Sequence, residues 1–396
     1  MRIIPAYIAC VFSVVVWSCD DGDTCEKNDI KSLLVSIQPL EVPILDAEGY
    51  YHSVSDVVIF QDSIYYLGFD GGKSTIDIYN LSSKSFRQKI YLPTQGPNAI
   101  NHYGGQVAMK ALSLDTIVFI SPYKDFYLVD GEGEILCHQR LNFDKFGADR
   151  PYQSLDFLSL GVSELANCPV TPDSKGNVYV ALLWSEDYYE VSNLTVEYSL
   201  PPFLGIPVKE PDSMFFVGKY PEVSNQSSLP RSIVNSIAFS RDGQPVIQFE
   251  AFHQLYSPKR GFICANYSKQ NIDFRSYSTS KIINEKEEMQ FFISDPAYVA
   301  LVSDTSAGRY YRFVKHYQEY NDSSENPKLR LEADFSIQVF NEELEYLGEH
   351  RFAGGKYDYL KPHVMPGGRI LFSKETSANN SNKEEQLEFD IIAFDL

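Results

Sequence analysis

The sequence predicts an all-β protein, a six-bladed β-propeller closed by the N-terminal strand joining the last blade. Three observations lead to this fold. Short apolar segments alternate with tight turns along the chain, no long segment after the N-terminal region keeps a helical period, and a two-strand pattern recurs six times. Four antiparallel strands in each repeat are typical of a propeller blade.

Each repeat begins with two short strands joined by a turn of Asp, Gly or Ser, residue types that favour turns. The six predicted hairpins cover residues 56–68, 110–120, 169–180, 236–249, 298–313 and 362–372. A second hairpin is clear in three repeats, at residues 76–90, 126–137 and 336–347. The third and fourth repeats are less regular, and we interpret the proline-rich segment 201–211 as an insertion.

The two ends of the chain complement each other. The last repeat stops at its third strand, residues 389–394, and so lacks a fourth. An unpaired strand lies near the other terminus, at residues 33–37 and continuing toward 42–44. Placing it as the outer strand of the last blade closes the ring and removes an open sheet edge. The alternative, suggested by the irregular repeat lengths, is two packed all-β domains.

The N-terminal segment has the features of a secretory signal. Arg2 precedes an apolar stretch of about 15 residues, Ile3 to Trp17, which is within the range of signal-peptide cores. A bilayer span would need roughly 20 residues. We therefore predict a signal peptide at 1–18, an acidic linker at 19–32 and a single propeller domain at 33–396.

Ser18 followed by Cys19 resembles the lipobox read by lipoprotein signal peptidase. That resemblance implies cleavage before Cys19, lipid on its sulfur, and the membrane as a partner through this anchor. The acidic run after Cys19 resembles the export signal of Bacteroidetes surface lipoproteins, which implies an outer membrane lipoprotein exposed on the cell surface. Ordinary secretion with an incidental Cys19, and a retained membrane anchor, are the alternatives.

The formal net charge is −19, which argues against nucleic acid as a partner because phosphates require a basic surface. It argues equally against binding to anionic lipid by charge. Solubility alone is a sufficient explanation of the charge.

Four cysteines remain after Cys10 and Cys19 are set aside: Cys25, Cys137, Cys168 and Cys264. They form no C-x-x-C pair and no histidine lies at metal-ligand spacing, so we expect neither a metal ion nor another cofactor. An oxidising envelope permits a disulfide, but the sequence does not assign one, and free buried cysteine is the commoner outcome.

The chain also resembles the six-bladed, TolB-like propeller lipoproteins of Bacteroidetes, many of which belong to families of unknown function. The resemblance rests on the start at Cys19, Asp20 and Asp21 and on residues 92–98, Leu-Pro-Thr-Gln-Gly-Pro-Asn. The latter segment looks like a degenerate form of the Gly-Pro turn between blades. The resemblance covers most of the mature chain and transfers no catalytic residue.

Long connections are expected on one face of the ring, where binding sites of rigid scaffolds usually lie. They join strands two and three of a blade or one blade to the next. They cover residues 93–106, 142–167, 184–191, 201–231, 316–328 and 375–386. The alternative is that they are only tolerated insertions.

Two segments of this face carry the candidate ligand-binding residues. Trp184 lies beside Asp187, Tyr188 and Tyr189, and aromatic faces with a carboxylate suit a sugar ring or a basic peptide. His102 and Tyr103 form the second candidate. Ordinary packing between blades would also explain these aromatic residues.

The sequence lacks a G-x-S-x-G elbow and an H-E-x-x-H motif, so no catalytic residue is assigned. Our first hypothesis is a non-catalytic, surface-anchored propeller that binds a glycan, a peptide or a partner protein. The alternative is an envelope hydrolase or lyase acting on polysaccharide, which would place Asp, Glu, His or Arg together at the channel mouth. A weaker third hypothesis is a sensor or assembly subunit.

Overall fold

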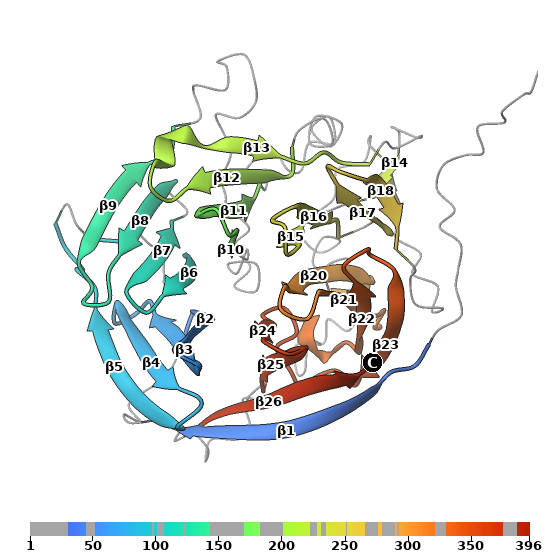
Figure 1. Ribbon diagram of the computed structural model, residues 1–396, viewed down its shortest axis with the longest axis horizontal. Helices are drawn as coiled ribbons and strands as arrows, with labels where there is room; N and C mark the ends of the chain where they lie inside the picture. Colours follow the sequence, from blue (N-terminus) through green and yellow to red (C-terminus); the bar gives the residue numbers. More distant parts are fainter. Residues whose placement is uncertain are drawn as a thin grey trace, which may run out of the picture.

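The computed structural model describes residues 31–44, 52–96, 99–100, 107–121, 124–142, 170–182, 201–221, 228–230, 235–250, 252–265, 276–278, 290, 293–320, 330–374 and 386–396. Six four-stranded antiparallel sheets stand around a central axis, which confirms the six-bladed propeller (Figure 1). In each blade the first strand is innermost.

The first three blades follow the chain in order. Blade 1 contains β2 (Val54–Phe60), β3 (Ser63–Asp70), β4 (Thr75–Asn80) and β5 (Ser85–Tyr91). Blade 2 contains β6 (Ala108–Ser113), β7 (Thr116–Ile120), β8 (Asp125–Val129) and β9 (Ile135–Arg140). Blade 3 contains β10 (Thr171–Pro172), β11 (Asn177–Ala181), β12 (Phe203–Pro207) and β13 (Phe215–Val217).

The remaining blades complete the ring. Blade 4 contains β15 (Ser236–Phe239), β16 (Pro245–Gln248), β17 (Gln254–Ser257) and β18 (Gly261–Cys264). Blade 5 contains β20 (Ala297–Asp304), β21 (Arg309–Lys315), β22 (Phe335–Asn341) and β23 (Tyr346–Phe352). Blade 6 contains β24 (His363–Met365), β25 (Arg369–Ser373), β26 (Gln386–Asp395) and β1 (Leu34–Pro43).

Short elements lie outside the blades. β14 (Ser228–Pro230) pairs with β19 (Ser276–Ser278), which joins the connections on either side of blade 4. The 3-10 turn Pro211–Ser213 precedes β13, the outer strand of blade 3. The 3-10 turn Arg330–Glu332 precedes β22, the third strand of blade 5.

The N-terminal strand closes the ring, as the sequence predicts. β1 runs antiparallel to β26 from the pair Leu34–Asp395 to the pair Pro43–Gln386, and Figure 1 shows the two strands side by side. Just before β1, the amide of Leu33 donates to the carbonyl of Glu349 in blade 5 (2.9 Å). The N-terminal strand therefore ties blade 6 to its neighbour as well as completing its sheet.

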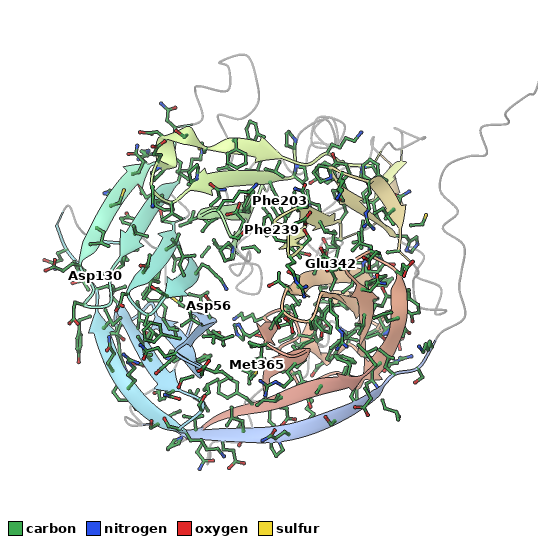
Figure 2. The ribbon with its side chains drawn as sticks, in the orientation of Figure 1. Asp56, Asp130, Phe203, Phe239, Glu342 and Met365 are labelled. Carbon is green, nitrogen blue, oxygen red and sulfur yellow. The ribbon has the colours of Figure 1, made fainter. Side chains whose placement is uncertain are left out.

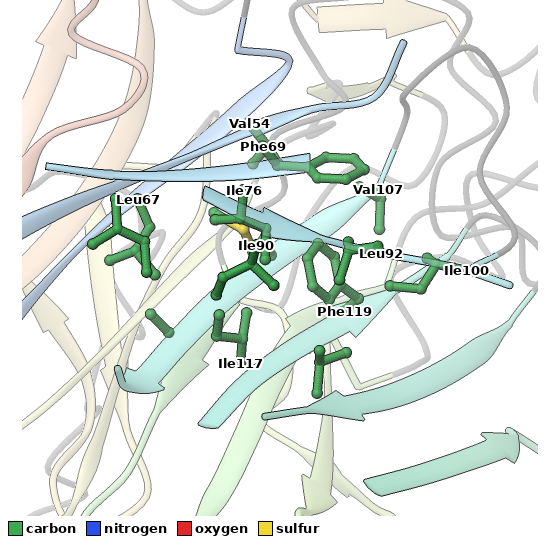
Figure 3. Close-up of a cluster of buried hydrophobic side chains, with 14 of the residues drawn as sticks. Val54, Leu67, Phe69, Ile76, Ile90, Leu92, Ile100, Val107, Ile117 and Phe119 are labelled. Carbon is green, nitrogen blue, oxygen red and sulfur yellow. The ribbon is translucent and has the colours of Figure 1, made fainter. Parts of the chain in front are cut away.

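Hydrophobic side chains pack between neighbouring blades, and the described residues form six such clusters. Figure 3 shows the cluster between blades 1 and 2, where Phe69 of β3 meets Phe119 of β7 with ring centroids 5.3 Å apart. The N-terminal segment contributes to two clusters: Leu33, just before β1, and Val35 of β1 pack in the cluster with blade 5, whereas Leu40 and Val42 of β1 pack in the cluster with blade 1. Because both faces of each sheet are covered, burial of apolar area stabilises every blade from both sides.

The interpretation of 201–211 as an insertion is wrong. Residues 203–207 form β12, the third strand of blade 3, and pair with β11 along its whole length. Phe203, Leu204 and Ile206 are buried. The prolines around this strand made its sequence resemble that of a loop. Pro201 and Pro202 come before it, and Pro207 is its last residue, where a missing N–H costs little.

Candidate functional site

The centre of the ring contains a cavity of about 540 Å³. Residues from the first strand of every blade, or from the segments beside it, line this cavity. Asp56 of β2, which is among them, is labelled near the ring centre in Figure 2, in contrast to Asp130 at the periphery. The volume falls within the range typical of small-molecule sites, roughly 300–1,000 Å³.

The channel has two different ends. All first strands run in the same sense, from the connections between blades to the tight turns that lead into the second strands. We call the first end the long-loop face and the second the turn face. The connections between second and third strands also leave from the long-loop face, because successive strands are antiparallel.

Polar groups at the turn face mainly bind neighbouring turns. Arg241 donates to the carbonyls of Thr305 (3.0 Å) and Ser306 (3.1 Å) of blade 5. Asp304 in turn accepts from the amide of Gly368 of blade 6 (2.6 Å). These contacts join blades 4, 5 and 6 at this end of the channel.

Asp173, also at the turn face, is occupied within its own blade. Its carboxylate accepts from the Asn177 side chain (2.8 Å) and the Tyr179 hydroxyl (2.9 Å). Desolvation by burial would raise the pKa of Asp173, but the hydrogen bonds from Asn177 and Tyr179 outweigh it and hold the pKa below its usual value. This carboxylate is therefore an ordinary turn anchor.

The channel wall nearer the long-loop face contains a cluster from three consecutive blades: His363 of blade 6, Asp56 of blade 1 and Lys110 of blade 2. Lys110 Nζ donates to Asp56 Oδ1 (2.8 Å), and the amide of Ala111 donates to Asp56 Oδ2 (2.8 Å). His363 Nδ1 lies 4.0 Å from Asp56 Oδ1. All three side chains line the cavity.

The imidazole of His363 is neutral at pH 7. Burial lowers its pKa to about 4, with Lys110 and Lys361 acting in the same direction and Asp56 against it. Its Nε2 atom has no hydrogen-bond partner in the protein. A buried polar atom without a partner carries a free-energy cost, and the Ser236 hydroxyl of the lining is a second atom of this kind.

The remaining wall mixes apolar and polar side chains. Val57, Met109, Ile237, Leu301 and Val364 are apolar, whereas Thr171, Ser174, Ser236, Ser240, Ser303 and Thr305 contribute hydroxyl groups. A wall that combines apolar surface with placed polar groups can hold a ligand by both kinds of contact.

A second buried polar group, outside the channel lining, has a structural role. Arg312 of β21 is fully buried and donates to the carbonyls of Phe252 (2.9 Å) and His253 (3.0 Å) in the β16–β17 connection. Its guanidinium lies 3.3 Å from the ring centroid of Tyr298. It thereby fixes a connection of blade 4 against blade 5.

The sequence-predicted site residues lie outside the described residues. These are Trp184, Asp187, Tyr188, Tyr189, His102, Tyr103 and the lipid-attachment residue Cys19. By sequence, the first four belong to the connection between β11 and β12, and the next two to the connection between β5 and β6.

Two of the four cysteines are described. Cys137 is a free thiol of intermediate exposure, whereas Cys264 is disulfide-bonded. Cys25 and Cys168 lie outside the described residues.

The sequence analysis missed the cluster of Asp56, Lys110 and His363. The available signal was their position: each is a charged or ionisable residue in an apolar first strand of a predicted hairpin. Their proximity is invisible in the sequence because Asp56 and His363 are joined only by closure of the ring.

Neither a metal centre nor a membrane helix is found in the part of the chain that the structure describes. No group of three or more His, Cys, Asp or Glu side chains there could hold a metal ion. Likewise, none of the helices within the described ranges is long and apolar enough to cross a bilayer.

Fold and cavity together define the class of protein: a six-bladed β-propeller with a ligand-sized channel. Residues 48–351 match the family model DUF4221, a domain of unknown function. The match covers most of the chain, and the protein therefore belongs to the DUF4221 family. No curated protein matches the chain at a significant level.

Two solved structures share the fold. A DUF4221 family member from Bacteroides vulgatus is 16% identical with a TM-score of 0.68, covering 92% of this chain and 99% of its own. A protein from Bacteroides fragilis, named as a candidate exported protein, is 12% identical with a TM-score of 0.53, covering 94% and 98%. At these identities the likeness concerns the fold alone.

Proposed function

We propose that the protein is a non-catalytic binding propeller of the bacterial envelope that takes its ligand from the long-loop face. The observation that carries this proposal is the channel cavity, which all six blades line with both apolar and polar groups. The ligand classes compatible with the proposal are a glycan, a peptide or a segment of a partner protein.

The charge state of the channel cluster favours binding over catalysis. Asp56 is paired with Lys110 and bonded to a backbone amide, and His363 is a weakly basic, neutral imidazole. Efficient general bases have a pKa near the working pH. The other carboxylate of the lining, Asp173, is held by Asn177 and Tyr179.

One observation favours the alternative, a polysaccharide hydrolase or lyase. Asp56, Lys110 and His363 meet inside the channel, and acid, base and cation in one cavity are the components of proton-transfer chemistry. We test the two functions by incubating the purified mature protein with polysaccharides and peptides and measuring both binding and turnover. Binding without turnover supports the proposal, whereas turnover lost in Asp56→Asn establishes the enzyme.

The proposed location rests on the N-terminal sequence. The candidate exported protein of B. fragilis with the same fold and the disulfide at Cys264 both fit an oxidising compartment outside the cytoplasm. We expect Cys19→Ala to abolish labelling by a fatty-acid probe and to leave an uncleaved signal or a soluble product. Undiminished labelling of this variant would exclude Cys19 as the lipid site.

We further propose that Trp184 and Tyr188 contact the ligand at the long-loop face. Replacing both by Ala then abolishes binding on a glycan or peptide array without lowering the melting temperature, because exposed aromatic anchors contribute to affinity and not to the core. A strongly destabilised double variant would instead indicate packing between blades, since truncation of a buried aromatic costs about 3–5 kcal/mol.

A further inference from the structure

The disulfide of Cys264, the last residue of β18, has a partner that can be found by elimination. The chain contains six cysteines, and the thiol of Cys137 is free. Cleavage of the predicted signal peptide removes Cys10, and the predicted lipid occupies the sulfur of Cys19. Two cysteines remain as partners, and both lie outside the described residues: Cys25 and Cys168.

Cys168 is too far from β18 to be the partner. It comes two residues before Val170, which lines the channel cavity. Two residues span about 7 Å at most, and the Cα atoms of a disulfide lie at most about 7 Å apart, so Cys168 reaches about 14 Å from Val170. Three strand spacings, about 14 Å, already separate β18 from β15 at the channel, and Val170 belongs to the neighbouring blade 3.

The outer strand of blade 4 lies next to that of blade 5. Arg260, directly before β18, donates through its Nη1 atom to the carbonyl of Glu343, in the turn before β23. Ile263 of β18 and Tyr346 of β23 pack against one hydrophobic cluster. Figure 1 shows β18 and β23 at the rim of the ring, each as the outer strand of its blade.

The N-terminal segment reaches the same part of the rim. The amide of Glu349 in β23 donates to the carbonyl of Lys31 (2.9 Å), and Ser32 forms a parallel bridge with Glu349. Cys25 comes six residues before Lys31, and six residues span up to about 20 Å. Packed sheets lie about 10 Å apart, so β18 of the adjacent blade is within the reach of Cys25.

We propose that Cys25 and Cys264 form a disulfide that fastens the N-terminal segment to the rim of blade 4. The oxidant is an envelope oxidoreductase in its disulfide form. It takes two electrons and two protons from the two thiols and leaves as a dithiol, while the new S–S bond joins Cys25 to Cys264.

The bond shortens the connection between the propeller and the membrane. This consequence rests on the proposed lipid site at Cys19, whereas the pairing does not. Without the bond, the tether runs from Cys19 to Lys31, twelve residues that span up to about 40 Å. With it, only six residues, or about 20 Å, separate the lipid from Cys25 and hence from blade 4. The disulfide therefore keeps the blade 4 side of the ring toward the membrane.

Peptide mapping tests the pairing. The mature protein is alkylated and digested without reductant, and its peptides are identified by mass spectrometry. We expect a linked peptide that contains Cys25 and Cys264 and separates on reduction. In Cys25→Ser the Cys264 thiol should be alkylated, whereas the control Cys168→Ser should keep the linked peptide. A bond between Cys168 and Cys264, or an alkylated Cys264 in the wild type, would overturn the inference.

A cleavable form of the protein tests the tether. A recognition sequence for a site-specific protease is inserted between Asn28 and Asp29, and the lipidated protein is placed on phospholipid vesicles. After cleavage the propeller should stay on the vesicles and leave them only when reductant is added. The cleaved Cys25→Ser variant should leave without reductant, and Cys168→Ser should behave like the wild type.

The outcomes separate this inference from the proposed lipid site. Release of the cleaved wild type without reductant would show that no disulfide bridges the cut, and the inference fails. Uncleaved protein that does not stay on vesicles would refute the lipid site and with it the short tether, while peptide mapping still decides the pairing.

Discussion

Arg312 illustrates how one buried side chain can organise a connection of the ring. Its planar guanidinium reaches two successive carbonyls, those of Phe252 and His253, and also the Gln248 side chain (3.3 Å). None of the carboxylates in the described part of the chain pairs with it. Burial lowers the pKa of Arg312 to about 10, so the side chain stays protonated at pH 7, and the Tyr298 ring and the carbonyls supply the compensating negative potential.

This arrangement predicts that lysine is a worse replacement than methionine. Arg312→Lys keeps a buried charge but loses the fork geometry, and we expect a loss of about 3–5 kcal/mol in the free energy of unfolding. Arg312→Met leaves carbonyls unpaired but removes the charge, and we expect a loss of only about 1–3 kcal/mol. Urea unfolding of both variants measures the difference. A lysine variant as stable as the methionine variant would contradict this account.

At the scale of the element, β1 is the part of the chain on which closure depends. Val35 of β1 packs against the cluster with blade 5, and Leu40 and Val42 are buried in the cluster with blade 1, so one strand contributes to the packing on both sides of blade 6. Its outer edge carries Pro39 and Pro43, which cannot donate to another strand. Proline on an edge strand opposes pairing with a second molecule.

We expect deletion of residues 32–45 to abolish cooperative folding. The deletion removes Leu33, Leu40 and Val42 from two clusters, at about 1.5–3 kcal/mol for each buried side chain. That sum is comparable to the whole stability of a typical domain. It also exposes the edge of β26 and so favours aggregation. Calorimetric unfolding and light scattering measure both effects.

A matched pair of substitutions on β1 provides the control. Val42→Ser should lower the melting temperature strongly, because Val42 is fully buried. Leu34→Ser should leave it nearly unchanged, because Leu34 is 74% exposed on the same strand. A deletion variant that melts like the parent would show that the ring does not need this strand.

At the scale of the whole molecule, buried histidines couple folding to pH. Burial lowers the pKa of both His363 and His316 from 6.5 to about 4, with Arg351 and Lys315 adding to the effect at His316. His316 Nε2 bonds to the Ser336 hydroxyl (2.7 Å) instead of to a carboxylate. Neither imidazole gains a proton in the folded state until the pH approaches 4.

We therefore expect the free energy of unfolding to fall between pH 6.5 and pH 4. Above pH 6.5 both histidines are neutral in the folded and unfolded chain, so pH has no effect through them. Below it the unfolded chain binds protons that the folded chain does not, which favours unfolding by about 2 kcal/mol per histidine at pH 5. Urea unfolding at pH 7.5 and pH 5 measures this loss.

His316→Gln should show a smaller loss of stability between these two pH values than the wild type. The carboxylates whose pKa is lowered in the fold, such as Asp173, stabilise the folded chain above their unfolded pKa of 3.8. That stabilisation is lost only when the pH falls below this value, so these groups do not change the stability between pH 7.5 and pH 5. An equal loss in His316→Gln and the wild type would refute the histidine explanation.

Local sequence patterns were sufficient to predict most of the fold. Tight turns and apolar runs identified the first hairpin of all six blades, and the incomplete last repeat identified β1 as the closing strand. β12 was missed because three prolines surround a run of only four residues, and only pairing with β11 makes that run a strand. Pairing depends on a partner more than twenty residues away, which a local pattern does not contain.

The sequence by itself determined the class of fold, the closure through the N-terminus and the acidic character of the molecule, because these follow from local periodicity and composition. Only the tertiary structure decided where the polar groups of the channel meet. Asp56, Lys110 and His363 are separated by up to 307 positions along the chain, yet closure of the ring brings them to one wall of a single cavity. Burial then sets their properties: it leaves His363 neutral and its Nε2 without a partner, and no residue pattern specifies that environment.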